Sequence, residues 1–93
     1  MNNMGGILQQ AQQMQRKMLE IDKKLSEMEV SGEVSNGLVR VIMTGKGVVK
    51  SIKIDKSLKE DIEVLEDLIV AAMHEAKKNA DNLSLKINAL SFA

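Results

Sequence analysis

The chain has 93 residues, of which 13 are basic and 13 are acidic, so its formal net charge at pH 7 is zero. It contains no Cys, which excludes disulfides and any thiolate metal or redox site. It has no Trp or Tyr and a single Phe, which excludes a nucleic-acid binder that stacks bases on several aromatic side chains. A chain of this length buries roughly 60–68% of the surface that it exposes when unfolded, so its own core is marginal and help from a partner subunit is expected.

No segment is typical of a membrane protein or a secreted one. The longest apolar run, residues 68–73, is far shorter than the ~20 residues that a membrane span needs. The first six residues, MNNMGG, lack the basic and apolar regions of a signal peptide. We therefore expect a soluble, cytoplasmic protein without a membrane partner.

The first predicted element is a long helix from about residue 4 to residue 28. Its apolar positions are spaced alternately three and four residues apart, as in the a and d positions of a heptad repeat. These positions are Met4, Ile7, Ala11, Met14, Met18, Ile21, Leu25 and Met28. Asn3 is a plausible N-cap. Because a helix of about 37 Å is longer than a small sheet can cover, the pattern predicts packing against another helix.

The middle of the chain changes to the two-residue period of strands. Strands are predicted over residues 30–34, 39–44 and 48–54, with turns at Ser35-Asn36-Gly37 and at Gly45-Lys46-Gly47. In the third strand Val49 is out of phase with Ile52 and Ile54, which predicts either a bulge near residues 50–51 or burial of both faces. The strands are expected to form a three-stranded antiparallel meander.

The last element is again a long helix, predicted to begin at a capping box formed by Ser57 and Glu60. Helical spacing of apolar residues continues to Leu90. The predicted fold class is therefore α+β, an α-β-β-β-α protomer in which two long helices flank the meander. Residues 1–93 are expected to form a single domain.

The segment Gly45-Lys46-Gly47 is also a candidate phosphate loop. A P-loop requires the pattern GxxxxGK[ST] between a strand and a helix, so that the N–H groups of the helix point at the phosphate. Here the following residues, VVKSIKI, have the pattern of a strand. A tight turn with Lys46 at its tip is therefore the favoured interpretation.

The sequence offers no constellation for catalysis. His74 is the only histidine and has neither a second His nor a Cys as a partner. We therefore expect no enzyme activity, no metal, no cofactor and no small-molecule substrate.

Positive charge is concentrated in the middle of this neutral chain. Residues 36–59 contain six basic residues and one acidic residue, Asp55. The basic residues are Arg40, Lys46, Lys50, Lys53, Lys56 and Lys59. A sheet surface that attracts phosphate and an edge strand protected against aggregation both explain this excess, and the sequence leaves the two open.

The first helix carries the basic residues Arg16, Lys17, Lys23 and Lys24, with Glu20 and Glu27 between them. Four-residue spacings such as those of Arg16 with Glu20 and Lys23 with Glu27 favour weak ion pairs along a solvated face. On the residues alone, this solvated face is the favoured interpretation.

Four segments in order resemble the YbaB/EbfC family of bacterial nucleoid-associated proteins. They are QQAQQMQRKM (residues 9–18), LVRVIMTGKG (38–47), IKID (52–55) and LEDLIVAA (65–72). The resemblance extends over nearly the whole chain. It implies an α-β-β-β-α protomer that forms a homodimer, with long helices projecting like tweezers from a central sheet.

The resemblance also implies binding of double-stranded DNA with little sequence preference, and a role in chromosome organisation or gene regulation at the nucleoid. The family's projecting helices are its proposed DNA contacts, which here correspond to Arg16, Lys17, Lys23, Lys24, Lys77 and Lys78. Together with Arg40, Lys46, Lys50 and Lys53 of the basic hairpin, they form the predicted DNA-binding set. The alternative is a helical module that binds a DNA-repair or replication protein, with DNA contact incidental.

Overall fold

The computed structural model describes residues 4–92. In chain order it contains α1 (Met4–Glu27), β1 (Glu29–Val34), β2 (Val39–Thr44), β3 (Val49–Ile54), the short 3-10 helix η1 (Lys56–Leu58) and α2 (Ile62–Phe92). The strands form one antiparallel sheet in the order β1-β2-β3. The predicted α+β class, the α-β-β-β-α order and the meander are confirmed. The predicted Asn3 cap lies outside the described residues.

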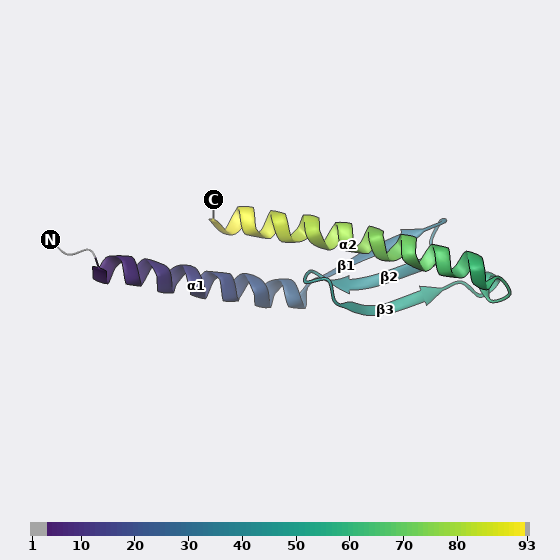
Figure 1. The fold of residues 1–93 in the computed structure, drawn as a ribbon, viewed down its shortest axis with the longest axis horizontal. Coiled ribbons are helices and arrows are strands. Elements are labelled where there is room, and N and C mark those ends of the chain that lie inside the picture. The colour runs from purple at the N-terminus through teal and green to yellow at the C-terminus, as the bar shows by residue number, and fades with distance from the viewer. Residues whose placement is uncertain (1–3, 93) are drawn as a thin grey trace.

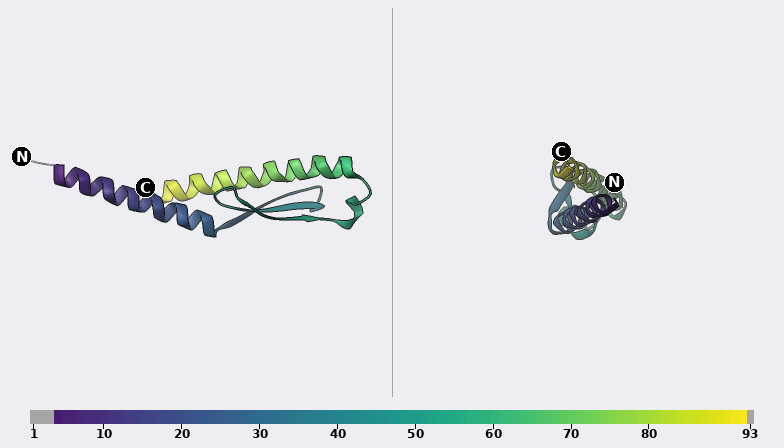
Figure 2. Two further views of the ribbon diagram at one scale, coloured as in Figure 1. Left: turned by 60° about the horizontal axis from the view of Figure 1, so that its bottom comes forward. Right: turned by 90° about the vertical axis from the view of Figure 1, so that its left-hand side faces the viewer.

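The molecule is a rod of 73 × 18 × 17 Å (Figure 1). α2 runs along one face of the sheet and continues past its edge, where its C-terminal part lies beside the C-terminal part of α1 (Figure 2). The N-terminal part of α1 extends farther and has no other described element beside it (Figure 2). Within residues 4–92, no helix is long and apolar enough to cross a membrane.

The main core lies between α2 and the inner face of the sheet, which is the face toward α2. The register places Val34, Val39 and Ile54 in one row across the three strands of this face. The next two rows are Gly32-Val41-Ile52 and Val30-Met43-Val49. The central strand supplies the buried side chains of these rows, because α2 packs over β1 and β2 and leaves β3 exposed.

A close approach of β1 to α2 defines this core. Ala72, Ala76 and Ala80 recur every four residues on α2 and are fully buried. A Cβ atom added at Gly32 would lie 2.2 Å from the backbone N of Ala76 and 2.5 Å from the carbonyl O of Ala72. Only a glycine opposite small residues permits this helix–strand distance, because backbone atoms cannot move aside as side chains do.

A second, smaller core fastens α1 to the rest of the molecule. It consists of Ile21 and Leu25 of α1 and Ile87 of α2. The backbone N–H of Gly45, in the β2–β3 turn, donates to the carbonyl oxygens of Leu25 and Met28, each at 3.0 Å. These bonds join the turn to the C-terminal end of α1, where the last carbonyl groups lack the donor that the next helical turn would supply. The buried side chains by which α1 packs on the rest of the described structure therefore lie in its last two turns.

Both predicted turns are confirmed. Ser35 and Asn36 have φ of 53° and 59°, and Gly37 has φ of 84°. The Gly37 N–H donates to the Val34 carbonyl at 3.1 Å, which closes the turn, and Asn and Gly are the residues that adopt positive φ most readily. In the second turn, Gly47 has φ of 86° and its N–H donates to the carbonyl of Thr44 at 2.9 Å.

The predicted bulge in the third strand is also confirmed. Ile42 pairs with Ser51, but Met43 pairs with Val49, so Lys50 is an extra residue in β3. The bulge restores Val49 to the inner face beside Met43, which explains the break in the alternation of the sequence.

The predicted capping box at Ser57 is wrong. Residues 56–58 form η1, whose N-cap is Asp55, and the Asp55 side chain accepts a hydrogen bond from the Ser57 N–H at 2.9 Å. This hydrogen bond lowers the pKa of Asp55 below its ordinary value of 3.8. α2 begins only at Ile62, where the Asp61 carboxylate accepts from the Val64 N–H at 3.3 Å. The intervening 3-10 turn brings Leu58 into the main core, and this burial decides where the helix begins.

Candidate nucleic-acid interface

The four basic residues of α1 remain available to a ligand. Arg16, Lys17, Lys23 and Lys24 are exposed, and in the part of the chain that the structure describes none of them is in an ion pair. The expected pairs Arg16–Glu20 and Lys23–Glu27 are not formed. Lys17 has another contact, since its Nζ lies 5.4 Å from the ring centroid of Phe92.

The two candidate lysines of α2 have acidic neighbours on the same helix. Lys77 forms an ion pair with Asp81, and Lys78 approaches Glu75 at 4.0 Å. Both lysines are exposed. Exposed ion pairs of this kind contribute about 0–1 kcal/mol, so a phosphate can replace the carboxylate at little cost.

The Gly45-Lys46-Gly47 turn is not a phosphate loop. The N–H of Gly45 donates to α1 carbonyls, that of Lys46 donates to Thr44 Oγ1 at 3.2 Å, and that of Gly47 donates to the Thr44 carbonyl. No N–H of the three points outward for an anion. The side chain of Lys46 is in an ion pair with Asp22 of α1. The predicted turn is therefore confirmed, and Lys46 also contacts the arm formed by α1.

The remaining hairpin cations share the outer face of the sheet, which is the face away from α2. Arg40 on β2 lies directly opposite Lys53 on β3 in the strand register. Lys50 reaches the same face through the bulge, and its Nζ donates to Glu29 Oε2 of β1 at 2.8 Å. These side chains line an open groove of about 500 Å³ whose floor includes the half-buried Ile42.

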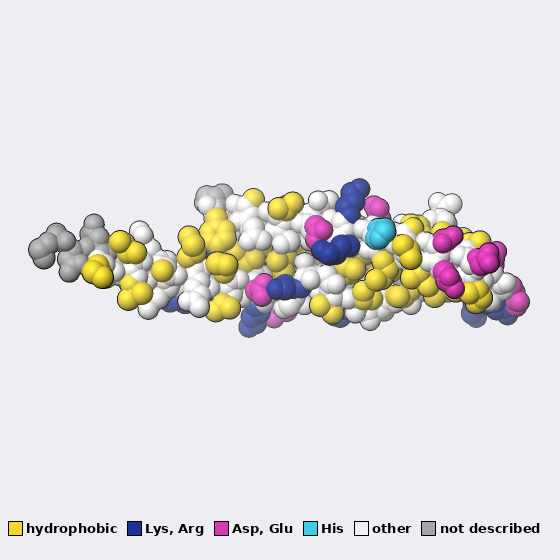
Figure 3. All heavy atoms as spheres, in the orientation of Figure 1, with side chains coloured by type: hydrophobic (Ala, Val, Ile, Leu, Met, Phe, Trp, Pro, Cys, Tyr) yellow, Lys and Arg dark blue, Asp and Glu magenta, His cyan; other side chains and the backbone are white. Residues whose placement is uncertain are grey.

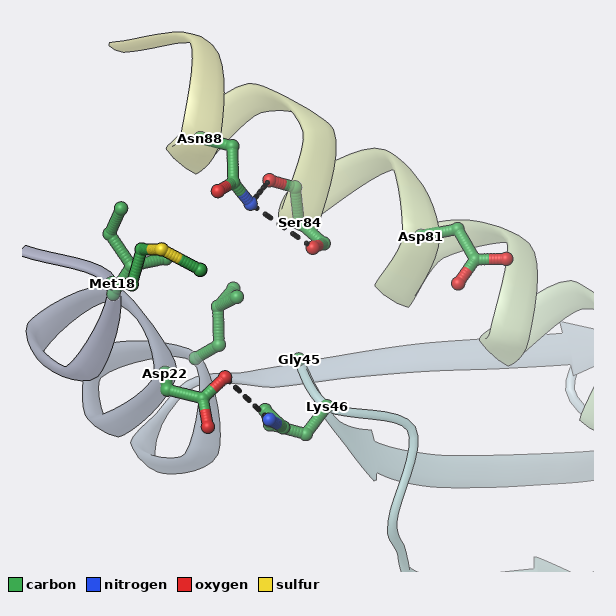
Figure 4. A pocket seen from close by; sticks show the side chains of 9 residues that line it. Met18, Asp22, Gly45, Lys46, Asp81, Ser84 and Asn88 are labelled. Carbon is green, nitrogen blue, oxygen red and sulfur yellow. Dashed lines mark hydrogen bonds and ion pairs between the residues drawn. The ribbon is translucent and has the colours of Figure 1, made fainter. Parts of the chain in front are cut away.

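A second hollow lies where α1, α2 and the β2–β3 turn meet (Figure 4). It has a volume of about 250 Å³ and is lined by Met18 and Asp22 of α1, by Lys46, and by Ser84 and Asn88 of α2. Asp22 and Lys46 form an ion pair with each other, and the Asn88 amide donates to the Ser84 carbonyl at 2.8 Å (Figure 4). Its polar groups therefore already have partners.

The charge is unevenly distributed along the rod. Outside residues 36–59 the chain has 13 − 6 = 7 basic and 13 − 1 = 12 acidic residues. On the face seen in Figure 3, acidic side chains gather over the N-terminal end of α2, whereas hydrophobic side chains follow α1 and the strip between α2 and the sheet. An extended anion is therefore favoured at the basic residues of segment 36–59 and disfavoured at the start of α2.

Comparison with known proteins assigns the family. The YbaB/EbfC DNA-binding family matches residues 1–87. The chain belongs to this family. Among its YbaB/EbfC relatives, a nucleoid-associated protein of Rhodospirillum centenum is 51% identical over 83 residues, which are 87% of this chain and 78% of the relative. A nucleoid-associated protein of Rhodospirillum rubrum is 48% identical over 85 residues, or 89% of this chain and 79% of the relative.

The YbaB/EbfC fold is also found in a crystal structure. An uncharacterized protein of Helicobacter pylori superposes with a TM-score of 0.81, covering 96% of this chain and 92% of that one. The sequence identity is 21%, so this likeness shows the fold alone.

Sequence reasoning located the candidate cations but missed the contacts that surround them. Asp22 was not identified as the partner of Lys46, because 24 residues separate the two in the sequence. The requirement for glycine at position 32, where β1 approaches the backbone of α2, was also missed. The four-residue recurrence of Ala72, Ala76 and Ala80 was the available evidence, since a small-residue stripe on a helix predicts a close approach by another backbone.

Proposed function

We propose that this chain is a nucleoid-associated protein that binds double-stranded DNA as a homodimer, through phosphate contacts and with low sequence specificity. Its membership of the YbaB/EbfC DNA-binding family carries the proposal, together with relatives of about half-identical sequence that are named nucleoid-associated proteins. The corresponding role is chromosome organisation or gene regulation, in the cytoplasm at the nucleoid. Residues 1–93 would act as one binding domain, not as an enzyme.

The elongated shape and large accessible surface of the protomer support a homodimer. A compact chain of 93 residues has a radius of gyration of about 12 Å, whereas this one has 19.2 Å. Its accessible surface of 7025 Å² exceeds by roughly 1,600 Å² that of a compact protein of the same mass. A stable interface buries roughly 800 Å² or more from each partner, so this excess is large enough for one.

Two apolar surfaces favour a second copy as the partner. One is the seam of α1, where Ile7, Met14 and Met18 are 63%, 57% and 58% exposed. The other is the inner face of β3, where Ile52 and Ile54 are 42% and 44% exposed because α2 does not cover them. A symmetric dimer would bury both surfaces without any other component.

The α1 helices would then act as two arms on the duplex. A helix of 24 residues is about 36 Å long, close to the ~34–36 Å of one turn of DNA. Arg16, Lys17, Lys23 and Lys24 would contact phosphates, and such contacts carry no sequence information. Arg16 and the glutamines of α1 are the side chains available to base edges, so any sequence preference would be modest.

The test is the binding of a labelled random-sequence duplex, followed by fluorescence anisotropy at low and near-physiological salt. The logarithm of the association constant is expected to fall with that of the salt concentration by about 0.9 per phosphate contacted. The variant Lys23→Glu with Lys24→Glu is expected to lose binding. Its control is Lys56→Glu with Lys59→Glu, which makes the same charge change at η1 and is expected to bind. Absence of binding by the unchanged protein at low salt would contradict the proposal.

A second candidate function is supported by the same exposed seam on α1. Three of its methionines, Met4, Met14 and Met18, stand at exposed heptad positions, and Met adapts readily to different partner surfaces. A helix of a DNA-repair or replication protein would fit this seam. In that case the Lys23→Glu, Lys24→Glu variant would retain its function in cells although DNA binding is lost.

A further inference from the structure

We propose that the outer face of the sheet is a second phosphate-binding surface, at which Arg40 and Lys53 grip the backbone of the same DNA duplex. The inference rests on the proposed DNA binding and says where on the protomer, apart from the helical arms, the duplex is held. Its occupant is a phosphodiester strand, and three observations on this face lead to it.

The first observation is a pair of like charges, neither of which is in an ion pair. Arg40 and Lys53 occupy directly opposite positions on β2 and β3, where Cβ atoms lie roughly 5 Å apart and like charges are destabilising. Within residues 4–92, neither side chain forms an ion pair. Glu33 is opposite Arg40 on β1, yet it does not pair with it. An anion bound between the two cations would remove this repulsion.

The second observation is the bulge that directs Lys50 to this face. In a regular strand Lys50 would share the inner face with Ile52 and Ile54, because side chains alternate. The extra residue instead places Lys50 beside Glu29, on the groove that Arg40 and Lys53 also line. Bulges often re-aim a side chain at a binding site. The Lys50–Glu29 pair is half-exposed on both sides and can be exchanged for a phosphate.

The third observation is the position of these groups at an open edge. β3 is an edge strand, so a duplex can approach Lys53 without passing over β1. Ser51 precedes Lys53 by two residues on the same face and lines the same groove, where its hydroxyl can donate to a phosphate oxygen. Arg40 adds the planar fork that suits a phosphate. Glu33 lies on the far side of Arg40, away from this edge.

The outer face also differs from the surface proposed for the dimer. The uncovered side chains of the inner face, Val49, Ile52 and Ile54, are apolar and suit another protein surface. The outer face has Ser31, Ile42 and Ser51 in one row and Glu33, Arg40 and Lys53 in the next. Burial of the apolar edge by a second copy would leave this polar and basic face to nucleic acid.

The experiment compares two variants of the whole chain that each lose two positive charges. Arg40→Gln with Lys53→Gln removes the opposed pair, and Lys56→Gln with Lys59→Gln is the matched control at η1. Binding of a random-sequence duplex is measured over a range of salt. The first variant is expected to bind at least about 10-fold more weakly at low salt, with a salt slope smaller by about 1.8 per protomer in contact, or 0.9 for each lost phosphate. The control is expected to bind as the unchanged protein does.

A second measurement uses the unchanged protein and does not depend on a variant folding. Lysines are acetylated with and without duplex, and the products are quantified by mass spectrometry. DNA is expected to protect Lys53 and to leave Lys56 and Lys59 reactive. Glu33→Gln is expected to change the DNA affinity in the opposite direction. Loss of the carboxylate beside Arg40 should tighten binding severalfold. The control Glu66→Gln, on α2, should leave the DNA affinity unchanged.

The outcomes separate this inference from the proposed function. If the unchanged protein binds DNA and the Arg40, Lys53 variant binds equally well with Lys53 unprotected, the inference is overturned and the proposed function stands. Aggregation of that variant with unchanged DNA affinity would likewise overturn it and assign these cations to edge protection. If the unchanged protein does not bind DNA at any salt concentration, both fail.

Discussion

Two regions of the molecule differ in how far their apolar side chains are buried. One is the sheet with the first half of α2, and the other is the N-terminal half of α1. Val39 and Val41 of β2 are 0% exposed, whereas Ile7 and Met14 of α1 are 63% and 57% exposed. Yet the heptad pattern of α1 is the most regular pattern in the sequence. The contrast teaches that periodicity identifies a face to be buried without identifying what buries it.

The two regions therefore differ in what their stability depends on. Strands β1 and β2 and the part of α2 that packs over them cover each other through contacts within one protomer, so these contacts do not depend on protein concentration. The projecting part of α1 has no such cover, and isolated helices of this length are marginal in water. Its order should therefore increase with association.

The largest expected effect breaks the covered region. Gly32→Ala places a methyl group against the backbone of Ala76 and Ala72, which cannot move without separating β1 from α2. We expect a loss of at least about 3 kcal/mol in the free energy of unfolding, at or above the upper end for overpacking. Denaturant unfolding followed by circular dichroism measures it.

The matched control is the same substitution at Gly6 of α1, where an added Cβ has no atom within 4 Å. Gly6→Ala should stabilise the helix by about 0.5–1 kcal/mol, because alanine loses less backbone entropy than glycine. Equal effects at the two sites would show that the close approach of β1 to α2 has no energetic importance.

A smaller effect is expected in the projecting region, where substitutions in the seam act on association and leave the fold of the protomer intact. Ile7→Glu with Met14→Glu adds charge to the seam of α1. Self-association should weaken by more than about 100-fold, since each side chain buried in an interface contributes about 1.5–3 kcal/mol. Unfolding of the sheet at low protein concentration should be unchanged. Analytical ultracentrifugation measures the first quantity and circular dichroism the second.

The control for the seam is Gln9→Glu with Gln12→Glu, which adds the same charge on the opposite side of α1. This variant should associate as the unchanged protein does. Equal weakening by both pairs would point to net charge, and not to the apolar seam, as the cause.

The smallest expected effect lies at the end of the covered region, where Asp55 caps η1. The hydrogen bond from Ser57 lowers the pKa of this carboxyl below 3.8. A lowered pKa in the folded state means that the ionised cap stabilises the fold well above pH 3.8, and that this contribution is lost as the pH falls through the folded pKa. Asp55→Asn should therefore slightly lower the melting temperature at neutral pH. The difference in melting temperature between this variant and the unchanged protein should become smaller near pH 3. A difference that is independent of pH would contradict this account.

Local patterns predicted most of the fold. The turn after β1 follows from Ser35-Asn36-Gly37, and the bulge is one of the two alternatives that the phase break between Val49 and Ile52 predicted. The start of α2 was predicted wrongly, since two residues can cap a helix equally well in sequence. Burial of Leu58, a long-range contact, selects Asp61 over Ser57.

The candidate site was predictable to a lesser extent. The basic residues of the hairpin stand out in the sequence, because a local charge excess requires no knowledge of the fold. Their division could not be predicted: Lys46 turns to Asp22 on α1, whereas Arg40 and Lys53 meet on the outer face of the sheet. Strand register and the path of a turn decide which charged side chains lie close together, and both depend on the whole packed structure.

The amino-acid order of this YbaB/EbfC chain is sufficient to specify its elements, their sequence along the chain and the faces they must bury, because helical and strand periods act over a few residues. Packing then selects how the elements meet. It brings Gly32 against Ala76, confines the cover of α2 to β1 and β2, and leaves the seam of α1 open. These outcomes depend on contacts between residues far apart in the sequence. Excluded volume and buried area decide which of those residues meet, and short-range periodicity does not record that choice.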